Sequence, residues 1–328
     1  MNNEFRLFII SIIGIIAVAV IPVKPATAAT GILQWGVVDT PGSQFNIVVN
    51  PSEVNAITAG GNTLFAIDTP HSKVYKSTEG GRGWDDISAN LTGAGAILPA
   101  WNIAVSRDNP NVVAVVTSTG GQPRQVFFSV DAGITWQNGN YSATADIGAI
   151  DVSMNYILIG TRTGSGAGNV YLSNLTKFGG WVAQNFVGDI LAIKMSPTFP
   201  ADNSIVIINS DATGTYTTIG THDIAGVTTT WKTAERVEIT GAGSGSSPKA
   251  AQIKTADLEL PFDFSGQNPA QQRIYVSTND ANATGNSGIY RIDATMIYKI
   301  FSQGAPTMIS SIAYYGTVGN GKLLAGEV

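Results

Sequence analysis

Carboxylates are the only plentiful catalytic groups in this chain. The sequence contains 23 Asp and Glu residues, two histidines, His71 and His222, and no cysteine. The missing cysteines exclude disulfides, thiolate zinc sites, iron–sulfur clusters and thiol nucleophiles. Two histidines are too few for a multi-histidine metal site. A Ser-His-Asp hydrolase is possible, but only these two residues could serve as its base. A pair of carboxylates about 5 to 9.5 Å apart could instead hydrolyse a glycosidic bond as acid and base or nucleophile.

Two other groups of residues have types that could do chemistry. Asp280, Asn282 and Thr284 imitate the start of a calcium-binding loop, but Arg291 stands where the bidentate Glu belongs. A polar hairpin loop is the simpler interpretation, so the sequence predicts neither a metal nor a cofactor. Both histidines lie in turn-like segments and are expected to be ordinary exposed side chains.

The composition favours a β-rich protein. The 328 residues include 37 Gly and 14 Pro, which favour turns over the interior of helices. Hydrophobic residues make up 44% and charged residues only 12%, so the chain can bury a large core under a surface rich in Ser, Thr and Asn. A net charge of −5 without a basic cluster disfavours nucleic-acid binding.

The N-terminus has the pattern of a secretory signal peptide. Arg6 precedes the apolar run 7–20, and Ala26-Thr27-Ala28 follows as a small-residue cleavage site. We therefore expect residues 1–28 to be removed and the mature protein to be secreted or displayed on the cell surface. The alternative is an uncleaved anchor over 7–23, and we expect membrane contact only in that case.

Short β-type phrases recur along the chain, each led by β-branched or aromatic residues. Four tryptophans follow these phrases or weaker copies of them at intervals of 45 to 52 residues, which is the length of a four-stranded propeller blade. The phrases are Val74–Ser77, Val126–Ser129, Val170–Ser173 and Ile289–Ile292, and the tryptophans are Trp84, Trp136, Trp181 and Trp231.

The segment 129–136 matches every fixed position of the pattern Ser-x-Asp-x-Gly-x-Thr-Trp. It resembles the Asp-box, or BNR repeat, of sialidases, sortilin-type receptors, xyloglucanases and photosystem assembly factors. The segment 77–84 departs at two positions, with Glu79 in the Asp place and Gly83 in the Thr place. The resemblance implies a structural role in a turn for Ser77, Glu79, Gly81, Trp84, Ser129, Asp131, Gly133, Thr135 and Trp136.

The resemblance implies an all-β fold, a β-propeller of four-stranded antiparallel blades. In closed propellers an N-terminal strand often completes the last blade, and 32–38, which looks like a fourth strand without a blade of its own, is the candidate. About six blades are visible and the last is incomplete: about 51–90, 100–143, 145–187, 188–240, 248–303 and a partial one at 304–328.

The incomplete last blade has two explanations. One is a six-bladed ring whose last blade is one strand short, and the other is a fragment of a longer protein. A missing third strand would leave a gap inside a sheet, so we expect the fragment. The stretch 257–272, with Phe262 and Phe264, is an insertion that could be a contact surface or a packed loop.

Family members that act on glycans use carboxylates at the mouth of the ring, and three residues qualify by position: Asp146, Asp151 and Asp189. The alternative is that they are ordinary turn or strand-end residues. The Arg-Ile-Pro signature of sialidases is absent, which disfavours sialidase activity.

Our leading hypothesis is a secreted or cell-surface, non-catalytic propeller that binds a protein or glycan at one face or assembles into an envelope structure. The alternative is a glycoside hydrolase of xyloglucanase type that uses paired carboxylates. An assembly factor for a membrane complex ranks last because the arginines are scattered rather than clustered.

Overall fold

The computed structural model describes residues 53–141, 144–153, 155–176, 180–225, 227–239, 249–280, 287–302 and 309–327. The expected signal peptide and the candidate ring-closing strand at 32–38 lie outside these residues. The loop residues Asn282 and Thr284 lie outside them as well.

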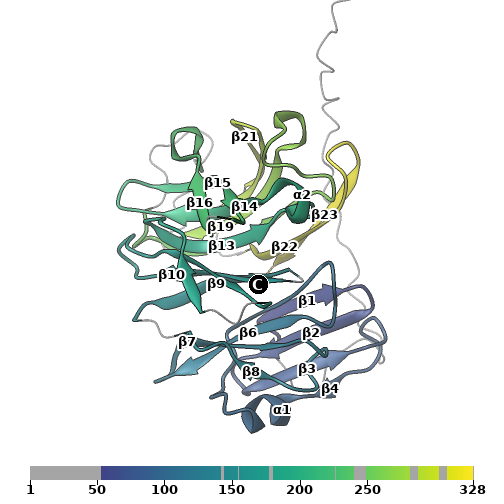
Figure 1. Cartoon of the computed structure of the whole chain (residues 1–328). Coiled ribbons are helices and arrows are strands. Elements are labelled where there is room, and N and C mark those ends of the chain that lie inside the picture. The colour runs from purple at the N-terminus through teal and green to yellow at the C-terminus, as the bar shows by residue number, and fades with distance from the viewer. Residues whose placement is uncertain are drawn as a thin grey trace, which may run out of the picture. The chain divides into compact units, whose positions relative to one another are not determined.

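The described residues form four four-stranded antiparallel sheets, one five-stranded antiparallel sheet and a two-stranded hairpin, coloured in chain order from purple to yellow in Figure 1. Within each sheet the strands follow one another in sequence, and we call the sheets blades 1 to 5. Blade 1 contains β1 (Ala56–Gly60), β2 (Thr63–Asp68), β3 (Lys73–Ser77) and β4 (Asp85–Asp86), and blade 2 contains β5 (Asn102–Val105), β6 (Val113–Thr119), β7 (Gln122–Ser129) and β8 (Gln137–Asn138). Blade 3 contains β9 (Asp146–Val152), β10 (Tyr156–Arg162), β11 (Val170–Asn174) and β12 (Trp181–Ala183).

Blades 4 and 5 continue the same order. In blade 4 an extra short strand also pairs with the third strand, on the same side as the fourth strand. Blade 4 contains β13 (Asp189–Met195), β14 (Ser204–Ser210), β15 (Thr215–Asp223), β16 (Thr228–Trp231) and β17 (Val237–Glu238). Blade 5 contains β18 (Ile253–Glu259), β19 (Arg273–Asp280), β20 (Gly288–Asp293) and β21 (Met296–Ser302), and the hairpin is β22 (Ile309–Gly316) with β23 (Gly321–Glu327).

The innermost strands of successive sheets pack against one another, in the order β1, β5, β9, β13, β18 and β22. This repeated stacking of twisted antiparallel sheets around their first strands is a β-propeller, and it confirms the fold class predicted from the sequence. The second strands are rich in β-branched residues, such as 204–210 (SIVIINS), and are buried because blades cover both of their faces.

The core consists of apolar layers between neighbouring blades. Blades 1 and 2 share a cluster that includes Phe65, Phe127 and Trp136, and the layer between blades 4 and 5 includes Phe264 and Tyr290. Each fully buried apolar side chain stabilises the fold by about 1.5–3 kcal/mol. The stability of one blade therefore depends on its neighbours.

Helices are few and short in the described residues. They are α1 (Ser88–Gly93), α2 (Phe199–Asp202) and the 3-10 turns η1 (Thr233–Glu235) and η2 (Pro269–Gln271). None of the helices in these ranges is long and apolar enough to cross a membrane.

Candidate functional site

The innermost strands are joined by side chains that reach from one blade to the next. Thr58 Oγ1 accepts a hydrogen bond from the Val105 amide at 3.2 Å, and Asp257 Oδ2 accepts one from the Ile312 amide at 2.9 Å. Asp151 Oδ2 accepts in the same way from the Met195 amide at 2.7 Å. The residues that occupy this register position on the six innermost strands form what we call the inner ring: Thr58, Ala104, Asp151, Lys194, Asp257 and Ser311.

One cation of the inner ring stands among several carboxylates. Lys194 Nζ lies 3.1 Å from Glu259 Oε1, and attraction by Glu259 and by Asp151 raises the pKa of Lys194 despite its partial burial. Burial raises the pKa of Asp151, although Lys194 and the Met195 amide oppose this rise. Burial likewise raises the pKa of Asp257. Lys194 therefore offsets part of the negative charge of Asp151, Asp257 and Glu259.

The other two predicted catalytic residues have different surroundings. Asp146 begins β9, is 38% exposed and forms an ion pair with Arg124 at 2.7 Å. Asp189 begins β13, is fully buried and accepts hydrogen bonds from the amides of Thr163 and Gly164 at 2.8 and 2.7 Å. It also accepts from the Thr163 hydroxyl and the Gly168 amide. Asp189 thus holds the turn between β10 and β11 in place.

The structure does not bring Asp151 together with the other two candidates. Asp146 and Asp151 are five residues apart on one strand, which corresponds to about 16 Å at roughly 3.3 Å per residue. Asp189 is at the start of β13, whereas Asp151 binds Met195 at its end, a length of about 20 Å. Both lengths exceed the carboxylate separations of about 5 to 9.5 Å that glycosidases use.

An arginine crosses the ring at the end where the innermost strands begin. Arg162, the last residue of β10, donates from Nη1 to the Lys254 carbonyl at 2.7 Å and from Nη2 to the Ile253 carbonyl. Its guanidinium therefore links blade 3 to the start of β18 in blade 5. We call this the start end of the ring, and the opposite end, where the innermost strands finish, the finish end.

At the finish end, three exposed side chains lie against one another. Tyr315 is 75% exposed and Phe262 is 40% exposed, and their ring centroids are 4.9 Å apart in an edge-on arrangement. The Arg107 guanidinium lies 5.4 Å from the Phe262 centroid. We call Arg107, Phe262 and Tyr315 the finish-end patch.

Sequence reasoning found part of this patch. It singled out the stretch around Phe262 as either a contact surface or a packed loop. Phe264 is fully buried, as in a packed loop, whereas Phe262 is exposed, and a contact surface there stays a prediction. Asp257 and Glu259 belong to β18 rather than to the loop. Arg107 and Tyr315 were missed because they come from blade 2 and from the β22–β23 hairpin.

The segments 77–84 and 129–136, which we call the first and second box, form hydrogen-bonded turns between the third and fourth strands of blades 1 and 2. In the second box, Asp131 accepts from the Thr135 amide and hydroxyl at 2.8 and 2.6 Å, and Ser129 Oγ accepts from the Gly133 amide at 2.8 Å. Partial burial opposes ionisation of Asp131, but hydrogen bonds from Thr135 and Ser129 lower its pKa overall. In the first box Ser77 Oγ accepts from the Gly81 amide at 2.9 Å. These contacts are internal to the turns.

The two histidines differ, and one expectation was wrong. His71 is 46% exposed and its Nδ1 lies 2.9 Å from Asp68 Oδ1. His222 was expected to be exposed but is 1% exposed, because β15 places it between Tyr156 of blade 3 and Phe199. His222 therefore lies on a buried strand and not in a solvated loop.

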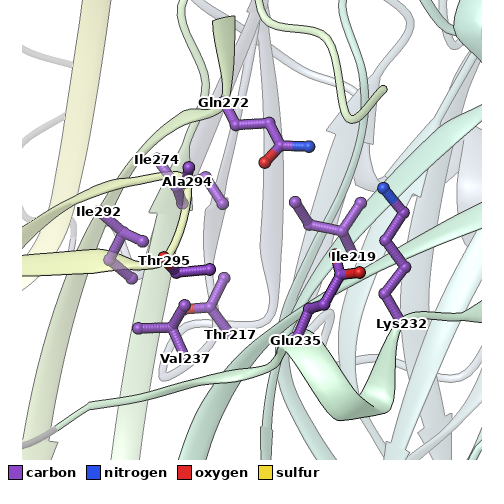
Figure 2. Close-up of a pocket in the computed structure, with 10 residues that line it drawn as sticks. All are labelled: Thr217, Ile219, Lys232, Glu235, Val237, Gln272, Ile274, Ile292, Ala294 and Thr295. Carbon is purple, nitrogen blue, oxygen red and sulfur yellow. The ribbon is translucent and has the colours of Figure 1, made fainter. Parts of the chain in front are cut away.

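Figure 2 shows the crevice between blades 4 and 5, whose lining includes Ile219, Lys232 and Gln272. Its cavity volume is about 20 Å³, room for roughly one water molecule, whereas ligand pockets hold about 300 Å³ or more. Lys232 Nζ and Gln272 Nε2, which line it, both donate to the Gly266 carbonyl. Among the described residues no group of three His, Cys, Asp or Glu side chains could hold a metal ion, and the predicted metal candidates Asp280, Asn282 and Thr284 lie outside the side chains that the structure describes.

The fold and the inner ring define the class of protein as a β-propeller. No family model and no curated protein matches the chain. Among solved structures, a putative TolB from Agrobacterium tumefaciens is 11% identical, with a TM-score of 0.51 over 85% of this chain and 91% of that one. YCF48 from Cyanidioschyzon merolae is 14% identical, with a TM-score of 0.48 over 82% of this chain and 78% of that one.

A GH74 xyloglucanase from Xanthomonas campestris is 12% identical, with a TM-score of 0.49 over 79% of this chain and 42% of that one. At these identities the likeness concerns the fold alone. The Asp-box assignment therefore stays a prediction that rests on the residues of the two boxes.

Proposed function

We propose that this chain is a secreted or cell-surface, non-catalytic β-propeller that binds a protein or a glycan, or takes part in envelope assembly. The observation that carries this proposal is that each candidate catalytic carboxylate is already engaged by the protein itself. Asp146 pairs with Arg124, Asp151 binds the Met195 amide and Asp189 accepts four hydrogen bonds from the β10–β11 turn. The signal-peptide pattern of 1–28 supports export.

The same features count against the alternative, a glycoside hydrolase of xyloglucanase type. Such an enzyme needs two carboxylates across the scissile bond and an open groove that admits the chain of sugars. Here Asp151 is separated from Asp146 by about 16 Å along β9. At the start end, the Arg162 guanidinium is already engaged by the carbonyls of Lys254 and Ile253 in blade 5.

The finish-end patch is the surface that we assign to binding. Aromatic side chains and arginine are the types most enriched where proteins bind partners, and aromatic faces also stack on sugars. The patch is held firmly, because the Phe262 amide donates to the Gly316 carbonyl at 2.8 Å and the Val318 amide donates to Asp263 at 2.7 Å. A preorganised surface binds at a smaller entropic cost.

The test combines binding and hydrolysis in one set of samples. The purified chain is titrated with xyloglucan oligosaccharides and with defined cell-wall glycans. Protein partners are identified by cross-linking, and each complex is then reconstituted from purified components. We expect binding without release of reducing ends. Tyr315→Ala should lower the affinity about tenfold or more, in the range of a binding hot spot. Met296→Ala is the matched control, because Met296 is 59% exposed on the outermost strand of blade 5.

Two results would contradict the proposal. Release of reducing ends from xyloglucan that is abolished by Asp151→Asn would establish the glycoside hydrolase instead. Equal losses of affinity in the Tyr315 and Met296 variants would show that the finish-end patch is not the binding surface.

A further inference from the structure

His222 is a buried histidine at the seam between blades 3 and 4. Its side chain is 1% exposed, its ring lies 5.9 Å from Tyr156 of β10 and 6.3 Å from Phe199 of α2, and the ring of Phe199 is stacked on it. Its amide donates to the Asn203 carbonyl at 2.8 Å. The imidazole is therefore enclosed by side chains from two blades.

A chain of hydrogen bonds determines which ring nitrogen carries the proton. Thr229 Oγ1 donates to Gln184 Oε1 at 2.7 Å, so the hydroxyl can only accept from His222 Nδ1, which lies 3.3 Å away. Gln184 Nε2 donates to the carbonyls of Val182 and Val227, which fixes the orientation of the amide. Nδ1 of His222 therefore carries a proton.

The second nitrogen has no partner among the described residues. His222 Nε2 is buried and makes no hydrogen bond to the part of the chain that the structure describes, so a proton added there would be poorly compensated. The titratable groups that interact with the ring are Tyr156 on β10 and Asp223, the next residue on β15. Asp202 lies on α2, the helix that carries Phe199. Asp202 accepts from the amides of Ser204 and Gly266, and Asp223 is exposed to solvent.

The chain of hydrogen bonds through Thr229 and Gln184 also joins blade 3 to blade 4. Gln184 belongs to blade 3 and is fully buried, and its carbonyl accepts from Trp231 Nε1 of β16 at 2.8 Å. Trp231 packs on Phe186, with ring centroids 5.0 Å apart. A disturbance at His222 therefore reaches the contacts that join β16 of blade 4 to blade 3.

We propose that His222 is an acid-sensitive latch, which keeps the seam between blades 3 and 4 closed while the imidazole is neutral and loosens it when the ring is protonated. This inference is independent of the proposed binding function. Burial lowers the pKa of His222, and the attraction of Asp223 together with a backbone hydrogen bond to Thr228 only partly offsets this effect.

The direction in which stability changes with pH follows from the linkage between proton binding and folding. Because the pKa is lower in the folded state, the stabilisation is fully present above the unfolded pKa of about 6.5 and is lost as the pH falls below it. Between pH 7.5 and 5.5 the folding equilibrium constant should fall by up to about tenfold from this group.

The chain offers an internal control, since His71 is its only other histidine and is 46% exposed. Imidazole resonances of the full chain are followed by NMR from pH 8 to 5, and urea unfolding is measured at pH 7.5 and 5.5. We expect the His222 resonance to titrate well below 6.5. We also expect the loss of stability to disappear in His222→Phe and to persist in His71→Gln.

Hydrogen exchange locates the effect. After correction for the intrinsic pH dependence, amides of β16 and of 183–186 should exchange faster at pH 5.5, while those of β6 in blade 2 should not. A His222 resonance that titrates at or above 6.5 would overturn the latch without any variant having to fold. An acid loss that persists in His222→Phe, or exchange that rises evenly along the chain, would also overturn it.

Discussion

The first box (77–84) and the second box (129–136) have the same length and the same serine, glycine and tryptophan positions but different surroundings. Trp136 is 6% exposed and belongs to the apolar cluster that includes Phe65 and Ile87 of the preceding blade region. Trp84 is only half-buried, and its Nε1 donates within its own turn to the Gly81 carbonyl at 3.1 Å. The turn itself is therefore local, but the burial of its tryptophan is not.

The tryptophans of the two weaker repeats, Trp181 and Trp231, resemble Trp136 rather than Trp84, because each contacts the preceding blade. Trp181 Nε1 donates to the Gly139 carbonyl, at the end of blade 2, at 2.7 Å. Trp231 Nε1 donates to the Gln184 carbonyl of blade 3. The tryptophan on the outermost strand of a blade thus contacts the blade before it. The difference between the boxes indicates that this motif stabilises the propeller mainly by joining neighbouring blades.

The largest expected effect is at the two tryptophans. Trp136→Ala should lower the free energy of unfolding by about 3–5 kcal/mol, because it leaves a cavity between blades 1 and 2. Trp84→Ala should cost about 1 kcal/mol, since less of its surface is buried. Urea unfolding of both variants at pH 7.5 measures the difference. Equal losses of unfolding free energy in the two variants would show that burying Trp136 between the blades adds no stability.

A smaller difference is expected at the acidic position. Asp131→Ala removes the acceptor of three hydrogen bonds from Ser129 and Thr135 and should cost about 1–2 kcal/mol. Glu79→Ala should stay within about 0.5 kcal/mol, as is usual for an exposed side chain. Thermal unfolding of the pair tests this, and a larger loss for Glu79→Ala would refute the ranking.

The smallest effect would come from completing the first box. Combining Glu79→Asp with Gly83→Thr recreates the acceptor and hydroxyl of the second box and should stabilise by about 0.5–1 kcal/mol. Gly83 lies outside the left-handed region, and a Cβ there would meet Glu79 Oε2 at an ordinary 3.6 Å. Gly83→Thr alone serves as the control. No gain in the double variant would mean that these hydrogen bonds contribute little to an exposed turn.

Features that depend on neighbouring residues were predictable. The bonds of Asp131 to Ser129 and Thr135 span two and four residues, so the residue pattern alone identifies them. The alternation of β-type runs with Gly and Pro turns likewise predicts antiparallel sheets. The burial of His222 was not predictable, because it depends on Tyr156, which comes 66 residues earlier in the chain.

The candidate site shows the same division. The repeats predicted that Asp146, Asp151 and Asp189 lie on innermost strands or their loops, and the structure has them on β9 and β13. Their catalytic role stays a prediction. Their partners came from elsewhere: Lys194 meets Glu259 across 65 residues, and Arg162 reaches the Ile253 carbonyl across 91. No local pattern contains such pairs.

By itself, the sequence determined the class of fold, because strand periodicity, turn residues and box turns are set by interactions over a few residues. Only the tertiary structure decided which carboxylates are engaged, which histidine is buried and which aromatic side chains are exposed at the finish end. The physical reason is that charge compensation and burial depend on the distances between blades, and these distances arise only when the blades pack together.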